Sequence, residues 1–207
     1  MGTTRLKDVE GSVYMPFMVD LENLSLRPDA AILSIGAARF DPQLGIVLDT
    51  FRVDVDINDA MRHGHVDGGT IEWWLGQDKG AQEALLERKT FTLHAALAAF
   101  SRWLNYHWVA GDGEERPAIW ANGTQADIVW LENAYRAVGL SVPWHYQQPR
   151  DYRTFINEVL PPERVREVMD SVEQTMGGVI KHDASEDARF QALVLCEVLR
   201  RVMGWRI

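Results

Sequence analysis

Short apolar runs dominate the first quarter of the chain and predict three consecutive β-strands. The first run covers residues 14–19, and the second begins at Ala31. The third, residues 46–57, alternates apolar and polar side chains with a period of two, as a half-buried strand does. Residues 41–45 contain the Asp-Pro and Gly that favour a turn between the second and third strands. Three strands joined by short links predict an antiparallel meander.

A helical spacing replaces this pattern from Thr70 onward, and Thr70 is the predicted N-cap of the first helix. Residues 111–117 are predicted as a loop, and Pro143 and Pro149 interrupt the chain further on. Asp183 and Glu186 have capping-box spacing at the start of the last helix. The other predicted elements are helices over 81–88, 93–106, 126–138 (ended by Gly139) and 183–201, and a short strand over 118–120.

A meander followed by alternating helices and strands predicts an α/β fold, with a mixed sheet flanked by helices. We expect residues 14–207 to form a single domain, since 207 residues with 46% hydrophobic content suffice for one core. Residues 1–13 are polar and are predicted to be a flexible leader. They lack the apolar segment of a secretory signal, and no run of eighteen apolar residues predicts a transmembrane helix.

Charge and cysteine content narrow the functional classes. The net charge of −9 argues against a broad basic surface for nucleic acid. Nucleic acid would instead require a small site in which metal ions offset the phosphate charge. Cys196 is the single cysteine and lies in an apolar run, so we expect a buried thiol and no internal disulfide, which suits a reducing cytoplasm.

Candidate chemistry begins with Asp20 and Glu22, which follow the first apolar run. Residues two apart in a strand point to the same face, so the two carboxylates should emerge side by side. Their mutual repulsion is relieved by a cation, and Mg²⁺ prefers such oxygens. A solvated loop at the strand end is the alternative interpretation of this pair.

Three later residues extend this set. Asp127 falls in the first turn of a predicted helix, where an acid can also simply favour the helix dipole. His182 precedes the last helix and Asp187 lies in its early turns. This spacing can bring an imidazole and a carboxylate to one cleft, and histidine is suited to take a proton near neutral pH. An ordinary loop histidine remains the alternative for His182.

The ordered set resembles the DEDDh exonuclease superfamily, which has an RNase H-like fold. Further motifs are similar to its Rv2179c-like 3′–5′ exonuclease branch, to which phage exonucleases belong. The resemblance extends from about Phe17 to about Phe190. The motifs are Thr70-Ile71-x-Trp73-Trp74-x-x-Gln77, Trp120-x-Asn122-Gly123-Thr124, Pro143-Trp144 and Arg150-Asp151-x-Arg153-Thr154.

The resemblance implies a two-metal-ion 3′–5′ exonuclease that uses Mg²⁺ or Mn²⁺. It would hydrolyse single-stranded RNA or DNA from the 3′ end to nucleoside 5′-monophosphates. Asp20 would bridge both ions, Glu22 and Asp187 would complete the first, and Asp127 would hold the second. His182 would be the general base for the attacking water. A homodimer is implied by the resemblance alone.

The resemblance also implies contacts with the substrate. The backbone at Asn23 and Leu24 would hold the terminal nucleotide, and Asn122 belongs to a matched motif. Adjacent tryptophans on a helix diverge by about 100°, so we expect Trp74 in the core and Trp73 free to stack on a base. Arg153 is a candidate phosphate contact, with an ion pair to Asp151 as the alternative.

One position departs from the branch, which usually has an aromatic residue before the third acid where this chain has Ala126. This change could widen the site or weaken packing beneath Asp127. Three other functions stay open: a catalytically silent nucleic-acid-binding protein of the same fold, an RNase H-like endonuclease, and a structural acidic domain without a ligand.

Overall fold

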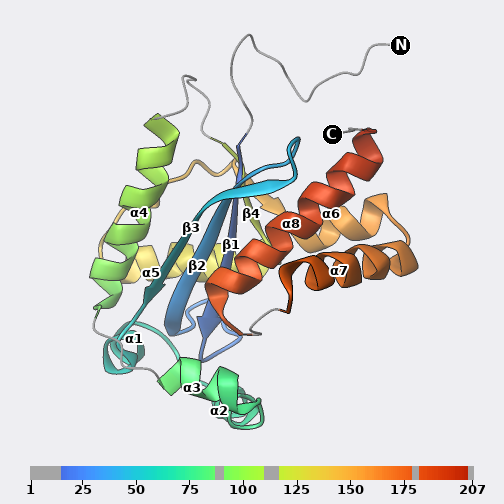
Figure 1. The fold of residues 1–207 in the computed structure, drawn as a ribbon. Coiled ribbons are helices and arrows are strands. Elements are labelled where there is room, and N and C mark those ends of the chain that lie inside the picture. The colour runs from blue at the N-terminus through green and yellow to red at the C-terminus, as the bar shows by residue number, and fades with distance from the viewer. Residues whose placement is uncertain (1–14, 87–90, 110–116, 179–181, 205–207) are drawn as a thin grey trace.

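The computed structural model describes residues 15–86, 91–109, 117–178 and 182–204. Within these ranges five strands form one mixed sheet in the order β3-β2-β1-β4-β5 (Figure 1). The β1–β2 and β2–β3 pairs are antiparallel, and β4 and β5 extend the sheet parallel to β1. The predicted meander is therefore confirmed. The strands are β1 (Phe17–Asn23), β2 (Ile32–Asp41), β3 (Ile46–Asp54), β4 (Ile119–Ala121) and β5 (Pro149–Asp151).

Helices cover both faces of the sheet, as predicted for an α/β fold. In Figure 1, α8 crosses in front of the sheet and α5 lies behind it. The helices α4 and α5 belong to one apolar cluster, and α6, α7 and α8 belong to another on the opposite face. The helices are α1 (Ile57–His63), α2 (Gly68–Leu75), α3 (Lys79–Leu86), α4 (Leu93–Val109), α5 (Val129–Ala137), α6 (Tyr152–Val159), α7 (Pro162–Met176) and α8 (Ala184–Met203).

The alternation of side chains along β1 decides on which face the acids lie. Phe17, Val19 and Leu21 pack into the cluster that contains α4 and α5. Met18 packs into the cluster of α6 to α8. Because successive strand residues face opposite sides, the even-numbered Asp20 and Glu22 point to the side of α8. The alternation along the strand is therefore enough to make both carboxylates face α8, the helix that carries Asp187.

Two predicted boundaries are wrong because an aspartate caps the following helix. The third strand ends at Asp54, because Asp56 caps α1 by accepting hydrogen bonds from the N–H groups of Asn58 and Asp59. The residues after it therefore belong to a helix. Similarly, Thr70 does not cap α2. That role falls to Asp67, whose carboxylate accepts the N–H of Thr70 at 3.1 Å.

The sequence interpretation did not include β5, α1, α6 or α7. In the last of these, Pro161 is the N-cap and Pro162 is the first residue, a position where proline fits a helix well. The buried positions of α7, Val165, Val168 and Val172, have helical spacing. The remaining predicted strands and helices of the described ranges are present, with shifted ends.

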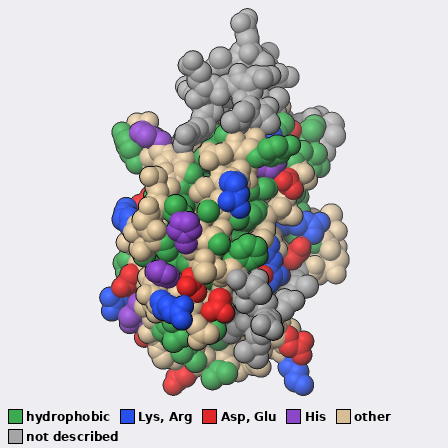
Figure 2. Space-filling view, turned by 90° about the vertical axis from the view of Figure 1, so that its left-hand side faces the viewer, with side chains coloured by type: hydrophobic (Ala, Val, Ile, Leu, Met, Phe, Trp, Pro, Cys, Tyr) green, Lys and Arg blue, Asp and Glu red, His purple; other side chains and the backbone are tan. Residues whose placement is uncertain are grey.

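The face on the α4 side of the molecule carries charges of both signs. In Figure 2, acidic and basic side chains of the described residues are interspersed among apolar ones. Cys196 is buried as predicted. No described helix is long and apolar enough to cross a bilayer. The predicted leader, residues 1–13, and nearly all of the predicted loop at 111–117 lie outside the described residues.

Candidate active site

The first two acids lie within β1 rather than after it. Asp20 pairs with Gly36 of β2 and Glu22 pairs with Ser34, and the register shifts between Glu22 and Asn23. Such a bulge redirects side chains and is common beside active sites. The Nε2 group of Gln191 on α8 donates a 2.7 Å hydrogen bond to Oδ1 of Asp20. This contact fixes the direction of the Asp20 carboxylate.

Asp127 lies in a π-helical turn, residues 124–128, between β4 and α5. Turns of this kind are rare in proteins, but those that occur are often found at functional sites. Asp127 is buried at 6% exposure, and its Oδ2 accepts the N–H of Gly123 at 3.3 Å. Asp151, at the end of β5, accepts bonds from the N–H and hydroxyl of Thr124 at 2.8 and 3.1 Å. Asp151 therefore holds the turn that presents Asp127.

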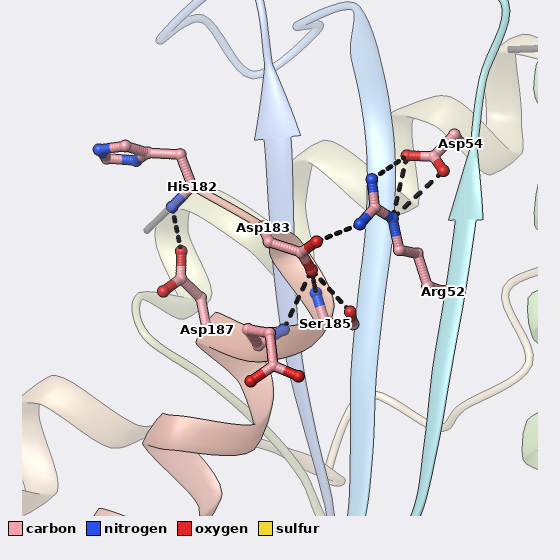
Figure 3. A network of polar contacts seen from close by, with 7 residues as sticks. Arg52, Asp54, His182, Asp183, Ser185 and Asp187 are labelled. Carbon is pink, nitrogen blue, oxygen red and sulfur yellow. Dashed lines mark hydrogen bonds and ion pairs between the residues drawn. The ribbon is translucent and has the colours of Figure 1, made fainter. Parts of the chain in front are cut away.

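Asp187 and His182 meet at the start of α8 (Figure 3). The backbone N–H of His182 donates to Oδ2 of Asp187 at 3.1 Å. One ligand atom each of Glu22, His182 and Asp187 lie within 4.8 Å of one another. The helix start therefore brings a carboxylate and an imidazole to the acids of β1, although more than 150 residues separate them in the sequence.

The two tryptophans of α2 differ in burial as predicted, with Trp74 buried and Trp73 half-exposed. Trp74 is 3% exposed, and its indole Nε1 donates to the carbonyl of Asn23 at 3.0 Å. Trp73 is 48% exposed, and its ring meets the His182 ring edge-on at a centroid distance of 4.9 Å. Trp74 anchors the bulge of β1, whereas Trp73 combines a contact with His182 and a free surface.

A cavity of about 840 Å³ joins these residues. Nine of the ten predicted site residues line it, and Leu24 does not. Leu24 is buried, its N–H is bonded to the carbonyl of Ala31, and its carbonyl accepts the N–H of Asp67. Ala126 is also part of the cavity wall. The nine lining residues are Asp20, Glu22, Asn23, Trp73, Asn122, Asp127, Arg153, His182 and Asp187.

Arg153 is the only arginine or lysine among the described residues that line the cavity. It is exposed and forms no hydrogen bond or ion pair with another described residue. The alternative of an ion pair with Asp151 is therefore not observed. Its positive charge lowers the pKa of Asp127, so it acts on the acidic cluster.

Burial and mutual repulsion disfavour the charged forms of the acids. Burial raises the pKa of Asp20 well above its usual range, and the charges of Asp127, Glu22 and Asp187 raise it further. Burial and the charge of Asp187 raise the pKa of Glu22 to about 8. Burial also raises the pKa of Asp127 to about 6. Cations stabilise the charged forms of carboxylates that are buried and close to one another.

The four acids fit hard divalent cations. Carboxylate oxygens are the ligands that suit Mg²⁺ or Mn²⁺ rather than a thiolate-binding metal. Sequence reasoning missed two supports of this set, Gln191 and the bulge in β1. Gln191 lies one helical turn after Asp187, and that spacing was the available signal.

Comparisons with known proteins assign this chain to one class of enzyme, the 3′–5′ exonucleases. Residues 15–199 match the family described as the 3′–5′ exoribonuclease Rv2179c-like domain. The chain belongs to this family and is a nuclease, and the predicted RNase H-like fold is confirmed.

Three relatives show the breadth of the similarity. An exodeoxyribonuclease of Enterobacteria phage T4 is 24% identical over 91% of this chain and 90% of its own length. The nuclease domain of 3′hExo, a DEDDh family member bound to rAMP, superimposes with a TM-score of 0.61 at 14% identity, covering 94% of this chain and 96% of that chain. Pop2p of S. pombe, with Mg²⁺ and Mn²⁺ bound, gives 0.59 at 15% identity, covering 94% and 86%.

Proposed function

We propose that this protein is a two-metal-ion 3′–5′ exonuclease that removes nucleoside 5′-monophosphates from the 3′ end of single-stranded RNA or DNA. The observation that carries the proposal is the convergence of four acids and His182 in one cavity. Composition does not favour nucleic acid, but this arrangement needs no basic surface. Family membership supports the reaction class.

Two divalent cations, Mg²⁺ or Mn²⁺, would be held by Asp20, Glu22, Asp127 and Asp187, and would polarise the scissile phosphate and lower the pKa of the attacking water. The charges of the other three acids all raise the pKa of Asp20, which supports its role as the bridging ligand. Gln191 keeps its carboxylate oriented, and Asp151 keeps the turn of Asp127 in place.

His182 would act as the general base. Its imidazole takes one proton from the water, whose oxygen bonds to phosphorus while the bond from phosphorus to the 3′ oxygen of the preceding nucleotide breaks. That oxygen takes a proton from solvent water and becomes the 3′ hydroxyl of the shortened strand. The edge-on contact with Trp73 limits the orientations open to the imidazole.

The cavity wall suits an unpaired nucleotide. The half-exposed Trp73 offers a face on which a base can stack, and stacking requires a base outside a duplex. Asn23 and Asn122 line the same cavity and would contact the terminal nucleotide. Arg153 would contact a phosphate. Leu24 would contribute to the nucleotide site by holding the adjacent segment in place.

The test is digestion of matched 3′-labelled and 5′-labelled RNA and single-stranded DNA oligonucleotides with Mg²⁺ or Mn²⁺. We expect nucleoside 5′-monophosphates at once from the 3′-labelled strand and a shrinking ladder from the 5′-labelled strand. The relatives include exoribonuclease and exodeoxyribonuclease names, so both nucleic acids are compared. Asp20→Asn serves as the inactive control.

Other outcomes would identify the rival functions. Cutting of a circular single strand would indicate an endonuclease, because an exonuclease needs a free end. Binding of oligonucleotides without any digestion would indicate a silent binding protein. The predicted homodimer is tested separately by the mass measured in light scattering, and the predicted cytoplasmic location by fractionation.

A further inference from the structure

Three residues form a row across the sheet beneath the start of α8. Asp20 of β1 is opposite Gly36 of β2, and Gly36 is opposite Arg52 of β3. Directly paired residues of antiparallel strands place their side chains on the same face. Asp20 and Arg52 therefore flank Gly36 on the face that carries α8.

The start of α8 lies directly on Gly36. A Cβ atom at that position would come within 2.0 Å of the carbonyl carbon of Ala184 and 2.3 Å of the backbone N of Ser185. The first turn of the helix thus sits between the active-site acids on one side and Arg52 on the other. Any shift of this turn would move His182 and Asp187 relative to Asp20.

Arg52 forms an ion pair with Asp183, the residue that caps this helix. Its Nη1 forms an ion pair with Oδ2 of Asp183, and its guanidinium also pairs with Asp54 at 3.2 Å (Figure 3). The other oxygen of Asp183 accepts the N–H groups of Ser185 and Glu186 at 3.0 and 3.2 Å. Asp183 is 7% exposed. The cap alone would need only one carboxylate oxygen, so the ion pair ties the helix start to β3.

His182 immediately precedes this anchor and has an unfavourable backbone. Its φ is +62°, which is the left-handed region that side chains with a Cβ rarely adopt. Such a conformation persists only where the surroundings hold it. The described supports are the bond from its N–H to Asp187 and the fixed position of Asp183 next to it.

We propose that Arg52 and Asp183 are positioning residues that hold His182 in this conformation and so aim its imidazole at the cluster of Glu22 and Asp187. The inference rests on the proposed function, in which His182 is the general base. Neither residue lines the cavity. Arg52 has a competing role, because its charge also lowers the pKa of Glu22.

A double-mutant cycle separates positioning from charge. Arg52→Met keeps much of the aliphatic stem and removes the guanidinium, while Asp183→Asn keeps a good N-cap and removes the charge. Each is made in the wild type and in His182→Ala. Arg164→Met is the control, because Arg164 forms an exposed ion pair with Glu167 on α7. Single-turnover rate, kcat and KM are measured on an oligonucleotide with saturating Mg²⁺.

In the wild type, we expect Arg52→Met and Asp183→Asn to lower kcat by about 10-fold to 100-fold, because small displacements of a catalytic group are costly. KM should stay within about twofold, since neither residue contacts substrate. In His182→Ala the same changes should cost much less, because residues that act through one another are non-additive. Arg52→Lys should fall between wild type and Arg52→Met, and Arg164→Met should match wild type.

Equal fractional losses in both backgrounds would overturn the proposal, because Arg52 would then act through charge on the acids. An unchanged kcat in folded Arg52→Met would overturn it as well. Melting curves establish which variants fold, and if Arg52→Met does not, Arg52→Lys carries the same comparison. An inactive wild type would refute the proposed function itself, and this is seen before any variant is compared.

Discussion

At the scale of single residues, Asp20 is the acid that we propose to bridge both cations. It accepts a hydrogen bond from Gln191 and interacts with the charges of three other carboxylates. Asp20→Asn keeps the shape of the side chain and removes one negative charge. We expect loss of nearly all nuclease activity with an unchanged far-UV spectrum, because the bridging ligand would be lost. A folded Asp20→Asn protein with full activity would contradict the two-metal site.

His182 gives a second prediction at this scale. If its neutral imidazole takes the proton, His182→Ala should retain oligonucleotide binding and lose turnover by about 10²–10⁴-fold. The pH–rate profile should also lose the acidic limb that protonation of this imidazole produces. Single-turnover rates across pH with saturating Mg²⁺ measure both effects. Superimposable profiles of wild type and variant would remove His182 from the mechanism.

At the scale of elements, the contact between α8 and β2 has no room for a side chain. Gly36→Ala would place a methyl group against the backbone of Ala184 and Ser185, so the helix start must shift. We expect a loss of about 1–3 kcal/mol in the free energy of unfolding, the usual cost of overpacking. Activity should fall with it, because the same turn carries His182 and Asp187. Urea unfolding and a rate assay measure the two effects.

Gly68→Ala is the matched control for this change, because nothing lies within 4 Å of a Cβ atom at Gly68. Alanine has the higher helix propensity there, so stability should be unchanged or slightly higher. A Gly36→Ala protein as stable and active as Gly68→Ala would show that α8 adapts without cost.

The elements also show which parts of the site the sequence could predict. Asp20 and Glu22 were predictable, because the period of two in a strand puts both on one face. The motif spacing similarly indicated His182 and Asp187. The bond from Gln191 to Asp20 was not predictable, since it joins residues 171 positions apart through packing of α8 on the sheet. Local spacing carries no information about such a pair.

Backbone irregularities were missed for a related reason. The π-helical turn at Asp127 and the bulge after Glu22 depend on how neighbouring elements pair, not on local propensity. The helix α7 was not predicted either, although Pro161 and Pro162 are well suited to the start of a helix.

At the scale of the whole molecule, bound cations should be coupled to folding. The acids converge only in the folded chain, so cations that bind there stabilise it by mass action. We expect Mg²⁺ or Mn²⁺ to raise the melting temperature of the wild type more than that of Asp20→Asn. At a concentration 100 times Kd the stabilisation is about 2.7 kcal/mol. Scanning calorimetry measures both melting temperatures. If they rise equally in the two proteins, the ions bind somewhere other than at Asp20.

The stability of the metal-free protein should depend on pH in a direction set by the same acids. In the folded state the pKa of Glu22 is raised from 4.5 to about 8, and that of Asp127 from 3.8 to about 6. At pH values between the unfolded and the folded pKa of each group, the folded chain binds more protons than the unfolded chain. Raising the pH through this range therefore lowers the free energy of unfolding. The contribution of Glu22 is complete below its unfolded pKa of 4.5 and is lost as the pH rises through about 8.

We therefore expect the melting temperature in a chelator to fall more steeply between about pH 5 and pH 8 in the wild type than in Glu22→Gln, which cannot titrate at this position. Saturating Mg²⁺ should flatten the wild-type curve, because cations favour the charged carboxylates that high pH produces. The measurement is a set of melting curves at constant ionic strength, with and without Mg²⁺. Parallel curves for the two metal-free proteins would show that Glu22 is already ionised in the folded chain. The repulsion among the acids would then have to be relieved in some other way than by protonating this carboxyl group.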